Sequence, residues 1–438
     1  MLGKIYIDNE WSLCKFDGND LYILKIRCEK PSIISNRVDL PNNLLIAICE
    51  DNYIYYFNTA SSIEIKLFSE YYYCCYENIN YFVLDGLYFD YSIRNINKVS
   101  FVGGTISAML QLMENNETDN GYEIIYASKK LSIKFNTLTV ENSDFCKLEY
   151  GNLLLDSQNV YTKYSIDISF ENTKDISFIL DVISKIYDFI KFINCNNSPC
   201  IQKIEISTDT FILNYFDKSI NYNCDKINSY NYLSNVKNHI GTALNFFLNN
   251  SLKFDFLSLL EKNSIDFEST NILSQAIESI VLDNDIECGK ILNTKIEKYY
   301  ELRKEINNTI INFEIANNCK IDNDDRNFIL TAVKIPTFRQ KVETLLNCYN
   351  YYVKNYNKYY YPLNENSIHN ISKSISNQRN NIHGEKSHTP DSFIYEIQYV
   401  IFGLLIYISK KCGFTDGEIF NLYNKIFLHR IQQKTHYN

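Results

Sequence analysis

Residues 164–170 read YSIDISF, and residues 174–194 read KDISFILDVISKIYDFIKFIN. In the first stretch apolar and polar residues alternate, which is the period of a half-buried β-strand. In the second stretch apolar residues recur every three to four positions, which predicts a helix with a wide apolar face. The change of period predicts a sheet with a helix packed against it.

Other runs with the same alternation lie on both sides of this stretch. They cover residues 63–67 and 131–135, and a further strand pair is predicted at 201–206 and 210–215. Turns rich in Asn and Asp separate the runs, as is typical of antiparallel strands. We therefore predict a β-rich N-terminal domain over residues 1–250.

From about residue 255 onward the apolar spacing is helical. This pattern predicts an all-helical domain over residues 255–438, arranged as an up-and-down bundle, so that the whole chain belongs to the α+β class. The predicted helices cover residues 272–282, 286–316, 337–357, 391–411 and 416–430.

Several residues mark the ends of these helices. Pro336 suits the first turn of the third helix. Asp391 can cap the fourth helix, which we expect to end at Gly413. Thr415 and Glu418 have the spacing of a capping box for the fifth.

Two polar stretches interrupt the helical pattern. Residues 359–390 are rich in Asn and Ser, and we interpret them as a long excursion before a helix. The acidic pair Asp324 and Asp325 is assigned to a polar linker, where a solvated turn is a commoner explanation than a metal site.

Charge is distributed unevenly along the 438 residues. The net charge is −9, but residues 326–438 carry 14 basic and seven acidic residues. A basic C-terminal region on an acidic body indicates either a local site for a polyanion or ordinary surface variation. The longest apolar run, Tyr399–Ile408, is shorter than the ~20 residues that span a bilayer. With no targeting segment apparent, we expect a soluble, cytoplasmic protein without a membrane partner.

The sequence contains few motifs for metals or cofactors. The 13 cysteines are scattered without a C-x-x-C pair, which favours buried, reduced thiols. Gly103 and Gly104 lack the Lys-Ser/Thr that completes a phosphate-binding loop, so we expect a turn or bulge there. We therefore predict no metal and no cofactor.

One segment combines residues that could cleave RNA. Residues 376–388 read SNQRNNIHGEKSH and contain Arg379, Asn380, His383 and His388. If the segment is helical, Arg379 and His383 share one face. The histidine could move a proton while the arginine stabilises charge on the phosphate, and Asn380 could hold either group by hydrogen bonding. RNA supplies its own nucleophile, the 2′-hydroxyl.

The spacing of these residues is by itself a weak signal. Arg430 and His436 have a similar spacing in the last residues of the chain. The same residues would also be expected at a solvated helix start that has no catalytic role.

The motif Arg379-Asn380 followed by His383-Gly384 resembles the signature of HEPN ribonuclease domains. In that family the signature lies near the start of a long bundle helix, and here it precedes the predicted helix 391–411. The HEPN resemblance covers about residues 260–430. The whole chain resembles the ApeA-like group of bacterial anti-phage proteins, which have a β-rich N-terminal region and a C-terminal HEPN domain.

The resemblance implies a metal-independent endoribonuclease of antiviral defence, with Arg379 and His383 as catalytic residues. Its expected substrate is RNA, with tRNA as one candidate, and cleavage would stop translation in abortive infection. The resemblance also implies a homodimer through the C-terminal domain and a phage-derived trigger sensed by the N-terminal domain. The three residues between Arg379 and His383 are fewer than the family usually has, which makes His388 a second candidate.

Two other functions remain open at this point. The chain could be a non-catalytic HEPN scaffold or binding module that regulates a partner. Alternatively, the β-rich domain could bind a ligand while the helical domain only mediates oligomerisation.

Overall fold

The structure is a computed structural model of the chain. It describes residues 1–7, 10–26, 44–51, 53–58, 63–67, 71–77, 79–84, 93, 95–110, 113, 121–141, 160–224, 233–250, 254–260, 267–280, 287–332, 337–355, 363–381 and 393–423.

The chain divides into two units. The N-terminal unit comprises residues 1–194 and 198–237, and the C-terminal unit comprises residues 195–197 and 238–438. The division expected from the sequence, between residues 250 and 255, falls farther along the chain, just after the helix at residues 240–249. As the sequence predicts, the N-terminal unit is built on an antiparallel sheet and the C-terminal unit is helical.

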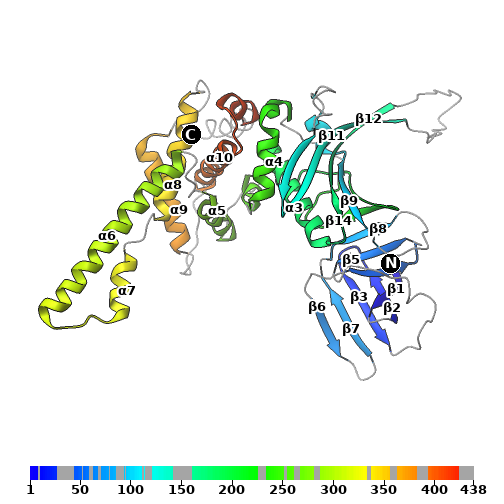
Figure 1. Cartoon of the computed structure of the whole chain (residues 1–438), viewed down its shortest axis with the longest axis horizontal. Helices are drawn as coiled ribbons and strands as arrows, with labels where there is room; N and C mark the ends of the chain where they lie inside the picture. Colours follow the sequence, from blue (N-terminus) through cyan, green and yellow to red (C-terminus); the bar gives the residue numbers. More distant parts are fainter. Residues whose placement is uncertain are drawn as a thin grey trace. The chain divides into compact units, whose positions relative to one another are not determined.

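Fourteen strands of the N-terminal unit form a single sheet (Figure 1). Their order across the sheet is β10-β11-β12-β9-β13-β14-β8-β5-β4-β1-β2-β3-β7-β6. All these neighbours pair antiparallel. The strands are β1 (Leu2–Ile7), β2 (Glu10–Phe16), β3 (Leu21–Ile26), β4 (Leu44–Cys49), β5 (Ile54–Asn58), β6 (Ile63–Leu67), β7 (Tyr71–Tyr76), β8 (Tyr81–Leu84), β9 (Ile96–Val102), β10 (Tyr122–Tyr126), β11 (Lys129–Glu141), β12 (Val160–Thr173), β13 (Lys203–Thr208) and β14 (Ile212–Phe216).

Helix α3 (Ile176–Asn194) confirms the predicted change of period. The ring of Phe178 lies 5.7 Å from that of Phe170 on β12 and 5.9 Å from that of Tyr126 on β10, measured between centroids. The helix therefore packs against the same face of the sheet that receives the apolar side chains of β12. These buried aromatic contacts join the two stretches from which the fold was predicted.

The middle of the sheet is buried on both faces. All five residues of β5 are buried, although neighbouring side chains of a strand point to opposite faces. Tyr55 and Phe57 belong to one apolar cluster with Phe16 of β2. Tyr56, which is fully buried, faces the other side of the sheet.

Gly103 and Gly104 form the turn that connects β9 to the short helix α1 (Thr105–Leu110), as predicted. Their φ angles are +71° and +61°, in the left-handed region that favours glycine. A Cβ atom on Gly104 would lie 2.3 Å from the carbonyl oxygen of Cys200. The position therefore requires glycine for both conformation and space.

The helices of the C-terminal unit surround α10, which is buried on all sides over residues 400–408. It contacts α8, α9, α5, α4 and η2, so the apolar run from Tyr399 to Ile408 is covered by its own chain. The elements after β14 are η1 (Leu233–His239), α4 (Ile240–Asn249), η2 (Asp255–Leu260), α5 (Phe267–Ile280), α6 (Glu287–Asn317), α7 (Asn323–Ala332), α8 (Phe338–Asn355), α9 (Glu365–Asn381) and α10 (Phe393–Lys411), and residues 416–423 are also helical.

Two of the predicted helix boundaries are confirmed. Gly413 has a φ of +79° and follows the end of α10. The Thr415 backbone donates a hydrogen bond to Glu418 Oε2 at 2.7 Å, and the Glu418 backbone donates to Thr415 Oγ1 at 3.3 Å, which is the reciprocal pattern of a capping box. Pro336 and Asp391 lie outside the described residues.

The prediction of a long excursion over residues 359–390 is wrong for its central part, which forms α9. Asn364 caps this helix by accepting a hydrogen bond from the Ser367 backbone at 2.8 Å. Ile368, Ile371 and Ile375 form a narrow buried stripe. Because Ser and Asn fill most other positions, the composition concealed an apolar spacing that is helical.

The assignment of Asp324 and Asp325 to a polar linker is also wrong. Both lie in the first turn of α7, where negative side chains favour the positive end of the helix dipole. Arg326 Nη2 lies 3.3 Å from Glu314 Oε2 of α6 and connects the two helices. The acidic pair thus marks the start of a helix.

The described helices include none that is long and apolar enough to cross a membrane. Of the nine cysteines whose side chains the structure describes, six are buried.

Candidate functional site

Arg379 occupies the last turn of α9, within reach of two neighbouring helices. It follows the buried Ile375 by one helical turn and therefore continues the stripe that packs against the bundle. Helix α9 contacts both α8 and α5 along this side. The sequence therefore places a guanidinium at the point where three helices meet.

Two contacts hold the Arg379 side chain. Its Nη2 lies 2.9 Å from Glu278 Oε1 on α5. Its guanidinium carbon lies 4.5 Å from the centre of the Phe338 ring on α8. Because the Arg379 side chain is still 36% exposed, part of the guanidinium remains accessible from solvent.

Lys341 adds a second cation beside the same carboxylate. It lies one turn after Phe338 on α8, and the residue is only 9% exposed. Its Nζ lies 3.9 Å from Glu278 Oε1, beyond hydrogen-bonding distance. We call Glu278, Phe338, Lys341 and Arg379 the Arg379 cluster; it holds two positive charges and one negative charge.

A second ionic group lies on the same two helices, α8 and α9. Glu343 Oε1 on α8 lies 3.1 Å from Arg339 Nε and 3.4 Å from His369 Nδ1. His369 precedes Arg379 by ten residues, or about 15 Å along a helix. This histidine therefore belongs to a site separate from the Arg379 cluster.

The structure describes only some of the site residues predicted from the sequence. Arg379 lies in the cluster just described, and Asn380 follows it as the penultimate residue of α9. His383 and His388 lie outside the described residues. The pairing of Arg379 with either histidine therefore stays a prediction.

Sequence reasoning missed the other members of the cluster. Glu278 is 101 positions before Arg379, and nothing in the local sequence connects them. The spacing of Phe338 and Lys341, three apart at the start of a predicted helix, could have suggested that they share a face. It could not have indicated which residue they meet.

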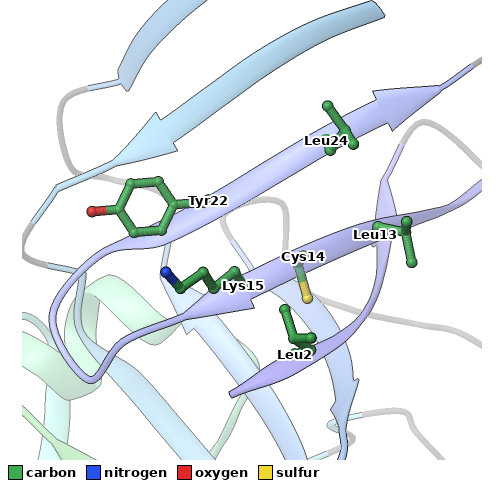
Figure 2. A pocket seen from close by; sticks show the side chains of 6 residues that line it. All are labelled: Leu2, Leu13, Cys14, Lys15, Tyr22 and Leu24. Carbon is green, nitrogen blue, oxygen red and sulfur yellow. The ribbon is translucent and has the colours of Figure 1, made fainter.

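A shallow pocket of about 490 Å³ lies in the N-terminal unit. Figure 2 shows its lining side chains, which come from β1, β2 and β3. The Lys15 Nζ lies 5.9 Å from the centre of the Tyr22 ring at one end of this mainly apolar surface. The lining residues are Leu2, Leu13, Cys14, Lys15, Tyr22 and Leu24.

This pocket suits binding better than catalysis. Among its lining residues Lys15 supplies the only charged group, with no carboxylate or histidine to exchange a proton with it. Within the described ranges, no group of three or more His, Cys, Asp or Glu residues could hold a metal ion. The Arg379 cluster, by contrast, brings two cationic side chains beside one carboxylate.

No protein-family model, no curated protein and no solved structure matches this chain.

Proposed function

We propose that this protein is a metal-independent endoribonuclease of the HEPN type that acts in antiviral defence. The observation that carries the proposal is the position of Arg379, at a junction of three helices with its partly exposed guanidinium held over the Phe338 ring. An oriented, partly exposed guanidinium suits a phosphate, whose oxygens it can bind through two parallel hydrogen bonds.

The chemistry would proceed on the RNA alone. The 2′-hydroxyl attacks the adjacent phosphorus, the 5′-oxygen of the next nucleotide leaves, and the products are a 2′,3′-cyclic phosphate and a 5′-hydroxyl. Arg379 stabilises the negative charge that develops on the phosphate. His383 transfers a proton from the attacking hydroxyl or to the leaving oxygen, with Asn380 and His388 as assisting residues.

The length of chain supports the assignment of His383. His383 is four positions after Arg379, so the two Cα atoms are at most about 14 Å apart. His388 is nine positions away and is much less constrained. We therefore assign His383 as the main proton-transfer residue and His388 as the alternative.

The remaining parts of the proposal rest on the resemblance to ApeA-like proteins. They are a cytoplasmic protein, an RNA substrate such as tRNA, a phage-derived trigger sensed by the N-terminal unit, and a homodimer formed through the C-terminal unit. The apolar run at 399–408 gives the dimer no support, because the chain's own helices bury it.

A non-catalytic scaffold is the second candidate function. The observation that favours it is the same pair of contacts on Arg379, because an arginine that only connects helices would also bind a carboxylate and stack on a ring. In that case the helical unit would bind and regulate a partner without cutting RNA.

Controlled expression in a bacterial host separates the two functions. We expect the wild type to slow growth and to produce RNA ends with 2′,3′-cyclic phosphates, and the purified protein to cleave RNA in EDTA. Arg379→Ala and His383→Ala should each abolish these effects, with a loss in rate of ~10²–10⁴-fold for the histidine. Arg379→Lys should not restore them, because lysine lacks the planar fork.

Arg339→Ala and His369→Ala are matched controls. They remove the same residue types from the same unit, from an ion-pair group on Glu343 that includes neither Arg379 nor Glu278. They should leave growth arrest intact. Equal toxicity of the wild type and the Arg379→Ala, His383→Ala double variant would refute the ribonuclease proposal, and cleavage that requires Mg²⁺ would indicate a different site.

A further inference from the structure

Lys341 presents an unusual electrostatic situation for a lysine. Its residue is 9% exposed, and its nearest described carboxylate oxygen, on Glu278, is 3.9 Å from Nζ. Restricting the access of water to an ammonium group is costly unless an anion or hydrogen-bond acceptors compensate. The contact with Glu278 is too long to be a hydrogen bond and compensates only partly.

Glu278 is shared between two cations. The same Oε1 atom lies 2.9 Å from Arg379 Nη2 and 3.9 Å from Lys341 Nζ. The three charged side chains together carry one excess positive charge. A single carboxylate therefore leaves the cluster able to attract an anion of higher charge or larger size.

The helix dipoles strengthen this preference. Glu278 lies in the last turn of α5, where the carbonyl end of the helix disfavours a negative side chain. Lys341 lies in the first turns of α8, whose amino end attracts anions. The Glu278 side chain is also 41% exposed, so it can turn into solvent without unfolding the helix.

We propose that Lys341 and Arg379 form an oxyanion-binding site that Glu278 occupies in the free protein and that a phosphate group enters by displacing Glu278. Arg379 binds the phosphate through its planar fork while Phe338 supports the guanidinium, and Lys341 supplies the second charge from the buried side. The identification of the natural ligand as an RNA phosphodiester rests on the proposed function.

Glu278 consequently acts as an internal competitor. A ligand must bind Arg379 more strongly than Glu278 does, so weakly charged anions should bind poorly. Removing the negative charge of Glu278 should therefore increase the affinity for phosphate. If Glu278 only positioned Arg379 for the ligand, the same substitution would decrease that affinity.

The test measures the binding of inorganic phosphate by calorimetric titration at constant ionic strength. Glu278→Gln should tighten binding by roughly two- to fivefold, the range expected when one exposed ion pair is removed. Lys341→Met and Arg379→Gln should weaken binding at least tenfold. Lys341→Met retains most of the buried stem of the side chain, and circular dichroism would check that it folds.

Glu343→Gln is the matched control, because Glu343 also forms an ion pair with an arginine of the same unit. It should leave phosphate affinity unchanged. Unchanged or weaker binding by Glu278→Gln would overturn the proposal, as would an equal gain for Glu343→Gln. If Lys341→Met does not fold, the Glu278→Gln result still decides the proposal.

A 2′-O-methyl oligoribonucleotide, which cannot be cleaved by attack of its own 2′-hydroxyl, separates this inference from the proposed function. Tighter binding of that oligonucleotide by Glu278→Gln supports the site even if the wild type never cleaves RNA. The opposite outcome is that the wild type cleaves RNA but neither Glu278→Gln nor Lys341→Met changes its affinity for phosphate or for the oligonucleotide. That result would overturn the proposed oxyanion site and leave the ribonuclease proposal intact.

Discussion

The guanidinium carbon of Arg379 lies 4.5 Å from the centre of the Phe338 ring, and the two side chains come from different helices, α9 and α8. The buried ring limits how the guanidinium can tilt, and Glu278 fixes the direction of one of its nitrogens. The orientation of Arg379 therefore depends on residues 41 and 101 positions earlier in the sequence.

Phe338→Leu should weaken the function of Arg379 without removing its charge. A cation–π contact of a partly exposed arginine is worth about 0.5–1 kcal/mol, so we expect RNA cleavage to fall by roughly two- to fivefold. Phe338→Tyr keeps the ring and should retain near-normal cleavage. Single-turnover cleavage rates measure the effect, and equal losses in both variants would contradict a role for the ring face.

Gly104→Ala should destabilise the N-terminal unit strongly. The added methyl group would combine a left-handed backbone penalty with a contact 2.3 Å from the Cys200 carbonyl oxygen, at a cost of about 2–5 kcal/mol. Gly18→Ala is the control, because its φ is +100° but its Cβ would meet nothing within 4 Å. Urea unfolding followed by circular dichroism should show the smaller loss for Gly18→Ala.

Glu418 should make the C-terminal unit sensitive to acid. Burial raises the pKa of its carboxyl, but hydrogen bonds from His239 and Thr415 together outweigh this effect and hold the pKa below its ordinary value of 4.5. The folded state therefore favours the ionised form. Its stabilising contribution is complete above the unfolded pKa and is lost as pH falls through the folded value.

The variant Glu418→Gln tests this assignment. The stability difference between the wild type and Glu418→Gln should be largest near pH 6 and should shrink below about pH 4.5, the ordinary value for the carboxyl. Thermal unfolding over that pH range measures it. A difference that is constant with pH would show that the loss reflects packing and not ionisation.

Tyr423→Phe should reduce stability modestly. The Tyr423 and Ser409 hydroxyls are 2.8 Å apart in a fully buried position, while Ser409 also donates a hydrogen bond to the Leu405 carbonyl. Losing a buried hydrogen bond typically costs about 0.5–1.5 kcal/mol. Tyr351→Phe, at an exposed position, should be nearly neutral in the same urea titration.

Light scattering at micromolar concentration should show a homodimer, as the resemblance to HEPN proteins implies. Because α10 is internal, substituting Val400 by Asp should unfold the C-terminal unit and not simply dissociate the dimer. A strict monomer for the wild type would contradict the dimer, and a folded, monomeric Val400→Asp variant would contradict the internal position of α10.

Much of the fold could be predicted because local patterns carried the necessary signal. In β12 and in α3, one face packs against the core and the opposite face is more exposed. This difference produces the alternation in β12 and the apolar stripe of α3. The capping residues Thr415 and Glu418 act within one helical turn, so their spacing was sufficient.

The prediction failed where the stabilising contacts join residues far apart in the sequence, or where a helix contains few apolar residues. Helix α9 depends on three isoleucines and on the fully buried Ser372, whose hydroxyl donates to the Ile368 carbonyl and so needs no other partner. The Ser- and Asn-rich composition of α9 is, taken alone, typical of a loop. Glu278 could not be found at all, because its partners come from two other helices.

The central position of α10 has a consequence for the order in which the C-terminal unit assembles. Synthesis proceeds from the N-terminus, and α10 comes after the helices α4, α5, α8 and α9 that it contacts. A nascent chain that ends before residue 393 lacks the helix around which they pack. Termination before α10 would therefore leave the Arg379 cluster without its supporting core, so that the site would assemble only after α10 has been synthesised.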